Sequence, residues 1–220
     1  MKDKLIKLSP LLFTIFGLIF LGFVSIKQFL IPRPVSFLVI QLLTVVSYVF
    51  YMSFESKISV NEMNKSASLD YDKNTMELAA LIKISLLASC LGLANQLIAS
   101  EYYLIVASIG YGIMLLGFFV RGKSIKDLGP HYGHRIREIG THLHDRGMYS
   151  VIRHGAYSGT FFIHAGVSLI FLNRFSLLFL CLWLGVVILR IQLEEKLLMQ
   201  DNRYKEYAKQ TRFKMIPFIW

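Results

Sequence analysis

Long apolar runs alternate with short polar segments along this chain. Six runs stand out, at residues 11–31, 35–54, 84–100, 102–120, 155–172 and 175–189, and only the first contains a charge, Lys27. A hydrocarbon core of about 30 Å needs about 20 helical residues, and backbone in lipid must satisfy its own hydrogen bonds. The pattern therefore predicts an all-α integral membrane protein with about six membrane helical segments, arranged as three antiparallel hairpins.

The composition supports the same fold class. Hydrophobic residues make up 55% of the 220 residues and charged residues 17%, whereas an ordinary soluble domain carries about 25% charged residues. This excludes a soluble globular domain, a disordered chain and a nucleic-acid-binding protein. Cys90 and Cys181 both lie inside apolar runs, so we expect core residues there and no disulfide framework.

The basic residues indicate an orientation. Of the 24 Lys and Arg residues, 20 fall in four segments, 1–10, 55–77, 121–154 and 190–220. Basic loops stay on the cytoplasmic side of a membrane, so we expect a multi-pass protein with both termini cytoplasmic. A basic cytoplasmic rim would also favour anionic lipid headgroups. Residues 55–77 mix charges of both signs, and we interpret them as a solvated linker without chemistry.

Two polar segments contain residues that are candidates for binding or catalysis. Residues 147–159 include the pair Arg153-His154 and the glycines Gly155 and Gly159. The pair is typical either of an interfacial anchor or of a nucleotide pocket, and the glycines allow either close helix packing or close approach to a ligand. Arg190 and Glu194 lie one helical turn apart at the end of the sixth run. They are either a snorkelling ion pair or a site that holds one anionic and one cationic group.

The histidines give weaker signals. His131, His134, His142 and His144 have HxxH-like and HxH spacings, but no carboxylate or cysteine set completes a metal site, so we expect no metal. His164 lies within the fifth run, where we expect a hydrogen-bonded packing residue.

The order of the motifs in residues 121–220 resembles a known family, the isoprenylcysteine carboxyl methyltransferases and their phospholipid methyltransferase-like relatives. The matching positions are Arg121, Leu128-Gly129, Gly147-Met148-Tyr149, Arg153-His154-Gly155-Ala156-Tyr157-Ser158-Gly159, Arg190, Glu194-Glu195, Leu198 and Pro217-Phe218. Gly155 replaces the proline of the family motif, and because proline would fix φ at a helix start, we expect a more flexible turn.

The resemblance implies a membrane methyltransferase that uses S-adenosyl-L-methionine. Residues 1–120 would form four transmembrane helices with lateral access for the acceptor, and residues 121–220 a catalytic region with the hairpin 155–189 and a cytoplasmic tail. The compact chain and its short loops resemble the family's prokaryotic members, and this resemblance favours a cell membrane. Arg190 and Glu194 would be the catalytic residues, with Arg190 facing the acceptor. The cofactor would contact Thr141, His142, Leu143, His144, Tyr149, Arg153, His154, Gly155, Ala156, Tyr157, Gly159 and Glu194.

The acceptor implied first is a prenylcysteine-like carboxylate on a lipidic or prenylated molecule. A carboxylate is ionised at pH 7 and needs no general base, and an arginine can hold both its oxygens. Alternatives are N- or S-methylation of a lipid amine headgroup or a small thiol. Two alternatives come from other classes of function: a non-catalytic membrane scaffold and a nicotinamide-dependent reductase relative.

Overall fold

The computed structural model describes residues 35–62, 74–92, 101–134 and 143–220, with isolated positions 12, 15–17, 19, 22, 23, 26, 97, 99 and 136. The first predicted helix therefore lies largely outside the described residues. Thr141 and His142 lie outside them as well.

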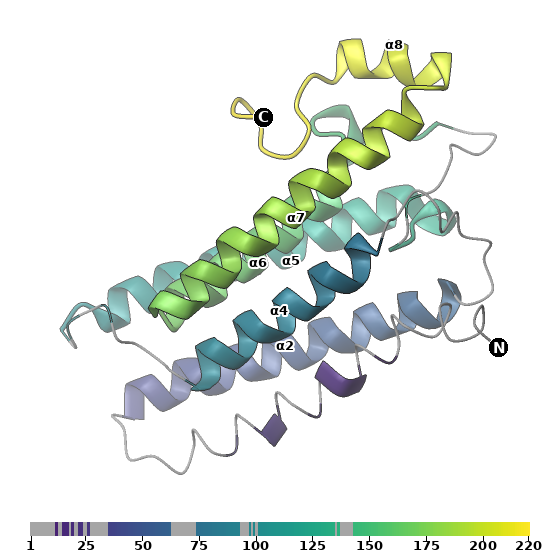
Figure 1. Ribbon diagram of the computed structural model, residues 1–220. Coiled ribbons are helices and arrows are strands. Elements are labelled where there is room, and N and C mark those ends of the chain that lie inside the picture. The colour runs from purple at the N-terminus through teal and green to yellow at the C-terminus, as the bar shows by residue number, and fades with distance from the viewer. Residues whose placement is uncertain are drawn as a thin grey trace.

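The described part of the chain is a bundle of long helices (Figure 1). In chain order they are α2 (Val35–Glu62), α4 (Thr75–Gly92), α5 (Tyr103–Leu128), α6 (Gly155–Ile170), α7 (Arg174–Leu198) and α8 (Asn202–Gln210), with short 3₁₀ turns at η1 (Gly129–His131) and η2 (Gly147–Ser150). Within the described residues the extended pairing is one isolated parallel bridge between Ile152 and Phe213. The all-α prediction is confirmed.

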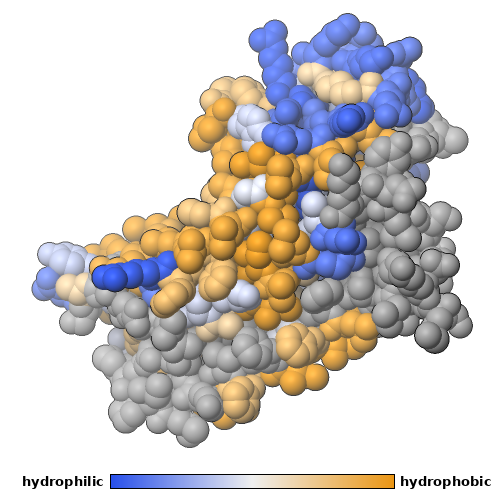
Figure 2. Space-filling view, in the orientation of Figure 1, coloured by the Kyte–Doolittle hydropathy of each residue, from blue (hydrophilic) through white to orange (hydrophobic). Residues whose placement is uncertain are grey.

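Three of these helices are long and apolar enough to cross a membrane: Val35–Ile58, Tyr103–His131 and Arg174–Leu198. Their outer faces expose large apolar side chains such as Ile105, Phe119 and Leu182, and the space-filling view shows an apolar body with a hydrophilic end (Figure 2). Such extensive exposed apolar surface is typical of a lipid-facing protein. α6 has 16 residues and at 1.5 Å per residue is about 24 Å long.

Glycines bring α5 and α6 into close contact. A Cβ atom on Gly117 of α5 would lie 2.5 Å from the backbone nitrogen of Ile163, and one on Gly110 would lie 2.8 Å from the carbonyl oxygen of Gly166. Small residues at these positions let two helix backbones approach closely, as in other membrane helix pairs. α5 consequently has its most extensive packing with α6, while α4 packs mainly on α7. The sequence predicted α4 and α5 as one hairpin, but each of them packs most closely against a helix of the last hairpin.

The turn between α6 and α7 has a clear local cause. The Asn173 side chain accepts from the backbone N–H of Ser176, and the Ser176 hydroxyl accepts in return from the backbone of Asn173, which forms a capping box. Asn173 also donates to the carbonyl oxygen of Ser89 on α4, 3.1 Å away. A polar residue between two apolar runs thus starts α7 and fixes it to α4.

The structure corrects the interpretation of residues 55–77 as a solvated linker. α2 continues through the start of this segment to Glu62, and α4 begins at Thr75. Glu55, taken as a solvated charge, is 5% exposed. The physical reason is an arginine from α5, described below, which neutralises the carboxylate and allows a charged residue to lie inside the bundle.

His164 of α6 is a satisfied packing residue, as expected. Its Nδ1 lies 2.7 Å from the carbonyl oxygen of Thr160, and its Nε2 lies 2.9 Å from the hydroxyl of Tyr48 on α2. A carbonyl can only accept, so Nδ1 carries the hydrogen and Nε2 accepts from Tyr48. The residue is fully buried and joins α6 to α2.

Candidate active site

One end of the bundle gathers the candidate residues of both polar segments. There the ends of α2, α5 and α7 meet the starts of α4 and α6, with α8 and the C-terminal tail beside them (Figure 1). Glu55 of α2 pairs with Arg121 of α5, and Thr75 of α4 accepts from Arg190 of α7. The described parts of three of the four basic segments, 55–77, 121–154 and 190–220, therefore share one end of the molecule.

Glu195 is the centre of a group that we call the tail cluster: Arg153, His154, Glu195 and Tyr204. Its Oε1 accepts from Arg153 Nε at 2.9 Å, His154 Nε2 at 2.8 Å and the Tyr204 hydroxyl at 2.7 Å, while Oε2 accepts from Arg153 Nη2 at 2.8 Å. Burial, together with the negative Glu195 that accepts its hydrogen bond, raises the pKa of the Tyr204 phenol far above its ordinary value. Tyr204 therefore stays a neutral donor.

Arg153 also ties the C-terminal tail to the start of α6. Its Nη1 donates to the carbonyl oxygens of Thr211 and Arg212, at 2.6 and 3.0 Å. Together with the bonds to Glu195, four of its five N–H groups are engaged within the protein. These contacts give Arg153 a structural role, and its contact with a cofactor stays a prediction.

Glu194 differs from its neighbour Glu195. Its side chain is 26% exposed and its Oε2 lies 3.7 Å from Nδ1 of His154. That oxygen is buried and accepts no hydrogen bond from the described part of the chain. A buried carboxylate oxygen without a donor is costly, and in a native protein it indicates a ligand, an ion or water at that point.

Arg190 is 3% exposed and lies among groups from three other segments. It donates from Nε to the Tyr157 hydroxyl at 3.3 Å, from Nη1 to Thr75 Oγ1 at 2.9 Å and from Nη2 to the carbonyl oxygen of His134 at 2.7 Å. The sequence placed Arg190 on one helix face with Glu194. The structure adds Tyr157, which was expected near the cofactor, and Thr75 and His134, which were not expected at the site.

Tyr149 packs at the base of this region. It is 7% exposed and lies in an apolar group with Tyr204 and Tyr207, against which Leu143 packs. Burial, and then the nearby Tyr132 and Glu194, raise the pKa of its phenol. The predicted residues Leu143, Tyr149 and Glu194 are thus brought to the same part of the molecule.

The turn before Tyr149 depends on a glycine. Gly147 has φ of +64°, in the left-handed region that favours glycine, and a Cβ atom there would collide with the carboxylate of Asp127. Asp127, at the end of α5, accepts from the backbone N–H of Met148 at 2.8 Å. Asp127 thereby fixes η2 against α5, a role that no sequence motif indicated.

Gly155 and Gly159 lie in the α5–α6 interface, so of the two interpretations given above the structure supports helix packing. A Cβ atom on Gly155 would collide with the hydroxyl of Ser124, and one on Gly159 with the backbone nitrogen of Arg121. The close contact with Ser124 leaves no room for a side chain at position 155, which explains why glycine stands here in place of the family's proline. Its neighbour Ala156 presents its carbonyl oxygen to Arg121 Nη1 at 3.0 Å.

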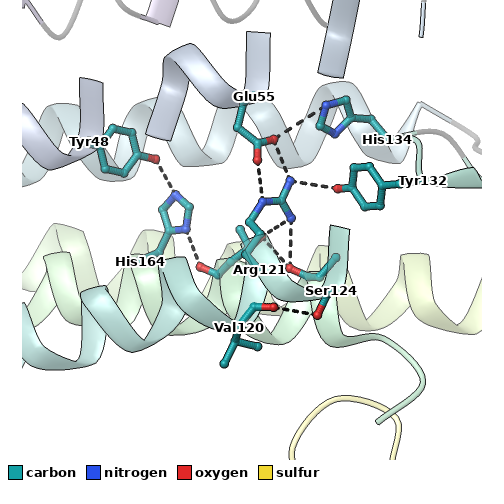
Figure 3. Close-up of polar contacts among 10 residues, drawn as sticks. Tyr48, Glu55, Val120, Arg121, Ser124, Tyr132, His134 and His164 are labelled. Carbon is teal, nitrogen blue, oxygen red and sulfur yellow. Dashed lines mark hydrogen bonds and ion pairs between the residues drawn. The ribbon is translucent and has the colours of Figure 1, made fainter. Parts of the chain in front are cut away.

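A second group, which sequence reasoning missed, joins α2 to α5. We call it the interhelix cluster: Glu55, Arg121, Tyr132 and His134 (Figure 3). Arg121 binds Glu55 at two points, Nε–Oε1 at 2.6 Å and Nη2–Oε2 at 2.7 Å, and donates to the Tyr132 hydroxyl at 3.0 Å. His134 Nε2 lies 3.7 Å from Glu55 Oε2.

Two further contacts complete the environment of Arg121. Its Nη1 donates to Thr160 Oγ1 at 2.7 Å, and its guanidinium group lies 5.8 Å from the centre of the Tyr51 ring. A sequence signal for Glu55 did exist. Polar or partly polar residues recur on α2 at the 3,4 spacing of one helix face: Gln41, Thr44, Tyr48, Tyr51 and Glu55, all of them buried.

The histidine-rich segment is only partly described. The rings of His131 and His144 lie 4.8 Å apart, and Nε2 of His144 is buried without a hydrogen-bond partner among the described residues. Within the described ranges no three His, Cys, Asp or Glu side chains are arranged to hold a metal ion.

Comparison with known protein families gives one match. The model of the phospholipid methyltransferase family matches residues 105–206, from the start of α5 to α8. A comparison with curated proteins finds no match. The matched residues contain the tail cluster, Glu194, Arg190 and Arg121. The motif order and the family match agree: residues 105–206 are similar to the phospholipid methyltransferase family, and this match supports a membrane methyltransferase.

Proposed function

We propose that the protein transfers a methyl group from S-adenosyl-L-methionine to a lipidic acceptor at one membrane boundary. The observation that carries this proposal is Glu194 Oε2, a buried carboxylate oxygen without a hydrogen-bond partner in the described chain. It lies beside His154, within the family match. A ligand that brings hydrogen-bond donors or a positive charge would satisfy it.

The chemistry of the surrounding residues fits this cofactor. S-adenosyl-L-methionine carries an ammonium group and ribose hydroxyls, which are donors, and a planar adenine. Glu194 would accept from the donors, while the aromatic rings of Tyr149 and Tyr157 would offer apolar surface to the adenine. Of the other positions expected to hold the cofactor, His154 is fixed by Glu195 at 2.8 Å. A fixed imidazole is suited to orienting a ligand because it loses little freedom on binding.

The reaction needs positioning more than acid–base help. When bound, the cofactor supplies an electrophilic methyl group on a sulfonium centre. The task of the protein is to align the acceptor and to exclude water. Arg190, nearly fully buried at the end of α7, would hold an acceptor carboxylate by charge-assisted hydrogen bonds. A carboxylate is already ionised at neutral pH, so no group of the chain has to remove a proton.

We propose a prenylcysteine-like carboxylate as the acceptor. The apolar outer faces of α5 and α7 suit lateral arrival of a lipid chain, and the site lies where these helices end. We further propose that this end of the bundle is cytoplasmic, because 17 of the 24 basic residues fall in the segments 55–77, 121–154 and 190–220, whose described parts meet there. Soluble cofactor and membrane-bound acceptor would then reach the site from different phases.

A second candidate is N-methylation of a phospholipid amine, which the description of the matched family favours. The two candidates differ in pH dependence. An amine must lose a proton before it attacks, so its methylation rate should rise about tenfold per pH unit below the amine's pKa, whereas a carboxylate should show little dependence near neutrality. Methyl transfer to a prenylcysteine and to a phosphatidylethanolamine vesicle, each followed from pH 6 to 9, would separate them.

The proposal is tested by calorimetric titration of S-adenosyl-L-methionine into detergent-purified protein. We expect binding in the micromolar range by the wild type and a loss of at least about tenfold in affinity in Glu194→Gln. Glu206→Gln, on the exposed face of α8, is the matched control and should bind as the wild type does. Failure of the folded wild type to bind would overturn the proposal, and titration with a nicotinamide cofactor would then test the reductase alternative.

A further inference from the structure

The segment from Tyr132 to His134 lies between two arginines. On one side Arg121 donates to the Tyr132 hydroxyl at 3.0 Å, and Glu55 Oε2 faces His134 Nε2 at 3.7 Å. On the other side Arg190 donates to the backbone carbonyl of His134 at 2.7 Å. The segment therefore connects the interhelix cluster directly to the guanidinium group of Arg190.

Two of the groups in this arrangement come from outside the family match. Glu55 belongs to α2 and Thr75 to α4, whereas the match covers residues 105–206. Glu55 fixes Arg121 at two points, which sets the direction of the bond from Arg121 to Tyr132. Thr75 accepts from Nη1 of Arg190 at 2.9 Å.

A guanidinium group on a long side chain has many orientations, and a site that aligns a reacting group needs one of them. We infer that α2 and α4 complete the active site, with Glu55 and Thr75 as positioning residues that fix the guanidinium group of Arg190. Thr75 acts by direct contact. Glu55 acts through Arg121, Tyr132 and the carbonyl group of His134. The catalytic consequence rests on the proposed acceptor-binding role of Arg190.

The geometric part can be tested without any activity, by labelling arginines with phenylglyoxal and locating the modified residues by mass spectrometry. Arg190 is 3% exposed and should react slowly in the wild type, whereas the exposed Arg212 gives a reference rate. In Glu55→Gln and in Thr75→Val we expect Arg190 to react about fivefold faster or more because its surroundings open locally. Thr75→Ser keeps the hydroxyl and should retain the wild-type rate.

Two controls separate local release from general loosening. Lys57→Gln removes an exposed charge from the same helix as Glu55 and should leave Arg190 protected. Arg153, which is 8% exposed and held by Glu195, should keep its wild-type rate in every variant. Because Glu55→Gln leaves Arg121 unpaired and can fail to fold, the double variant Glu55→Gln/Arg121→Gln removes both charges and should release Arg190 as well.

The catalytic part is tested by kinetics on the same variants. We expect kcat/KM for the acceptor to fall about tenfold in Thr75→Val, with the dissociation constant of S-adenosyl-L-methionine within about twofold of the wild type. Unchanged Arg190 labelling, or an equal rise at Arg153, would overturn the inference. Failure of the wild type to bind the cofactor would instead overturn the proposed function, while the labelling result would still decide whether α2 and α4 fix Arg190.

Discussion

Arg153 and Glu195 form a two-point ion pair at the end of the bundle, with Nε–Oε1 at 2.9 Å and Nη2–Oε2 at 2.8 Å. The adjacent Glu194 has an oxygen without a hydrogen-bond partner in the described chain. Two neighbouring glutamates on one helix thus have different tasks. Glu195 holds the tail cluster together, and Glu194 is the residue for which we propose a contact with the cofactor.

Glu195→Gln should destabilise the protein more than Glu194→Gln does. Removing one partner of a buried pair leaves the other charge uncompensated, which costs about 3 kcal/mol, and His154 and Tyr204 lose an ionised acceptor as well. Glu194→Gln should change the free energy of unfolding by less than about 1 kcal/mol. Denaturant unfolding in detergent measures both, with Glu206→Gln as an exposed control. Equal losses in the two variants would contradict the division of tasks.

Arg190→Ala should reduce turnover and spare cofactor binding. We expect kcat/KM for a carboxylate acceptor to fall about 100-fold, because the substitution removes a charge-assisted contact in a buried site. Arg190→Lys retains the charge but loses the planar fork, so its loss should be smaller, about tenfold. Single-turnover methyl transfer beside calorimetry of S-adenosyl-L-methionine separates the two steps. Normal methyl transfer by Arg190→Ala would show that Arg190 does not face the acceptor.

The tail cluster should make stability fall in alkaline solution. Burial and the Glu195 carboxylate raise the pKa of Tyr204 in the folded protein, whereas the unfolded chain ionises near pH 10. Below that pH the phenol is neutral in both states. Above it the unfolded state loses the proton first, so unfolding becomes easier by up to about 1.4 kcal/mol per pH unit. Thermal unfolding from pH 8 to 11 should show a shallower decline in Tyr204→Phe than in the wild type. Parallel declines would mean that Tyr204 ionises freely.

The glycines of the α5–α6 interface should differ in their tolerance of a side chain. Gly159→Ala would press a methyl group against the backbone of Arg121, and overpacking of this kind costs about 1–3 kcal/mol. Gly155→Ala would collide with the hydroxyl of Ser124, while its other near neighbours lie at 3.4 Å or more, so Ser124→Ala should restore its stability. Gly185→Ala, on α7 with open space around it, should be neutral or stabilising by up to about 1 kcal/mol. Thermal unfolding in one detergent ranks the three, and a neutral Gly159→Ala would show that this interface can move apart.

The sequence could identify helices because hydropathy is a local property. The runs at residues 155–172 and 35–54 agree closely with the start of α6 and α2, and Asn173 marks the turn that the structure forms as a capping box. The run at residues 84–100 was less accurate, since α4 covers Thr75–Gly92. There the helix includes charged residues that hydropathy assigns to a loop.

Motif order indicated the resemblance to the family because residues 121–220 keep its pattern at the expected spacing, and the match over residues 105–206 agrees. Tertiary structure alone decided which of two adjacent glutamates pairs with Arg153, and that the motif glycines face α5. It also decided that Glu55, 66 residues from Arg121, belongs beside it. A glutamate without a nearby basic residue on its own helix face is predicted to be exposed to solvent, because burial of a single charge is prohibitive. Helices that are distant in sequence must pack together to place a basic side chain beside the carboxylate, and the local sequence does not encode that contact.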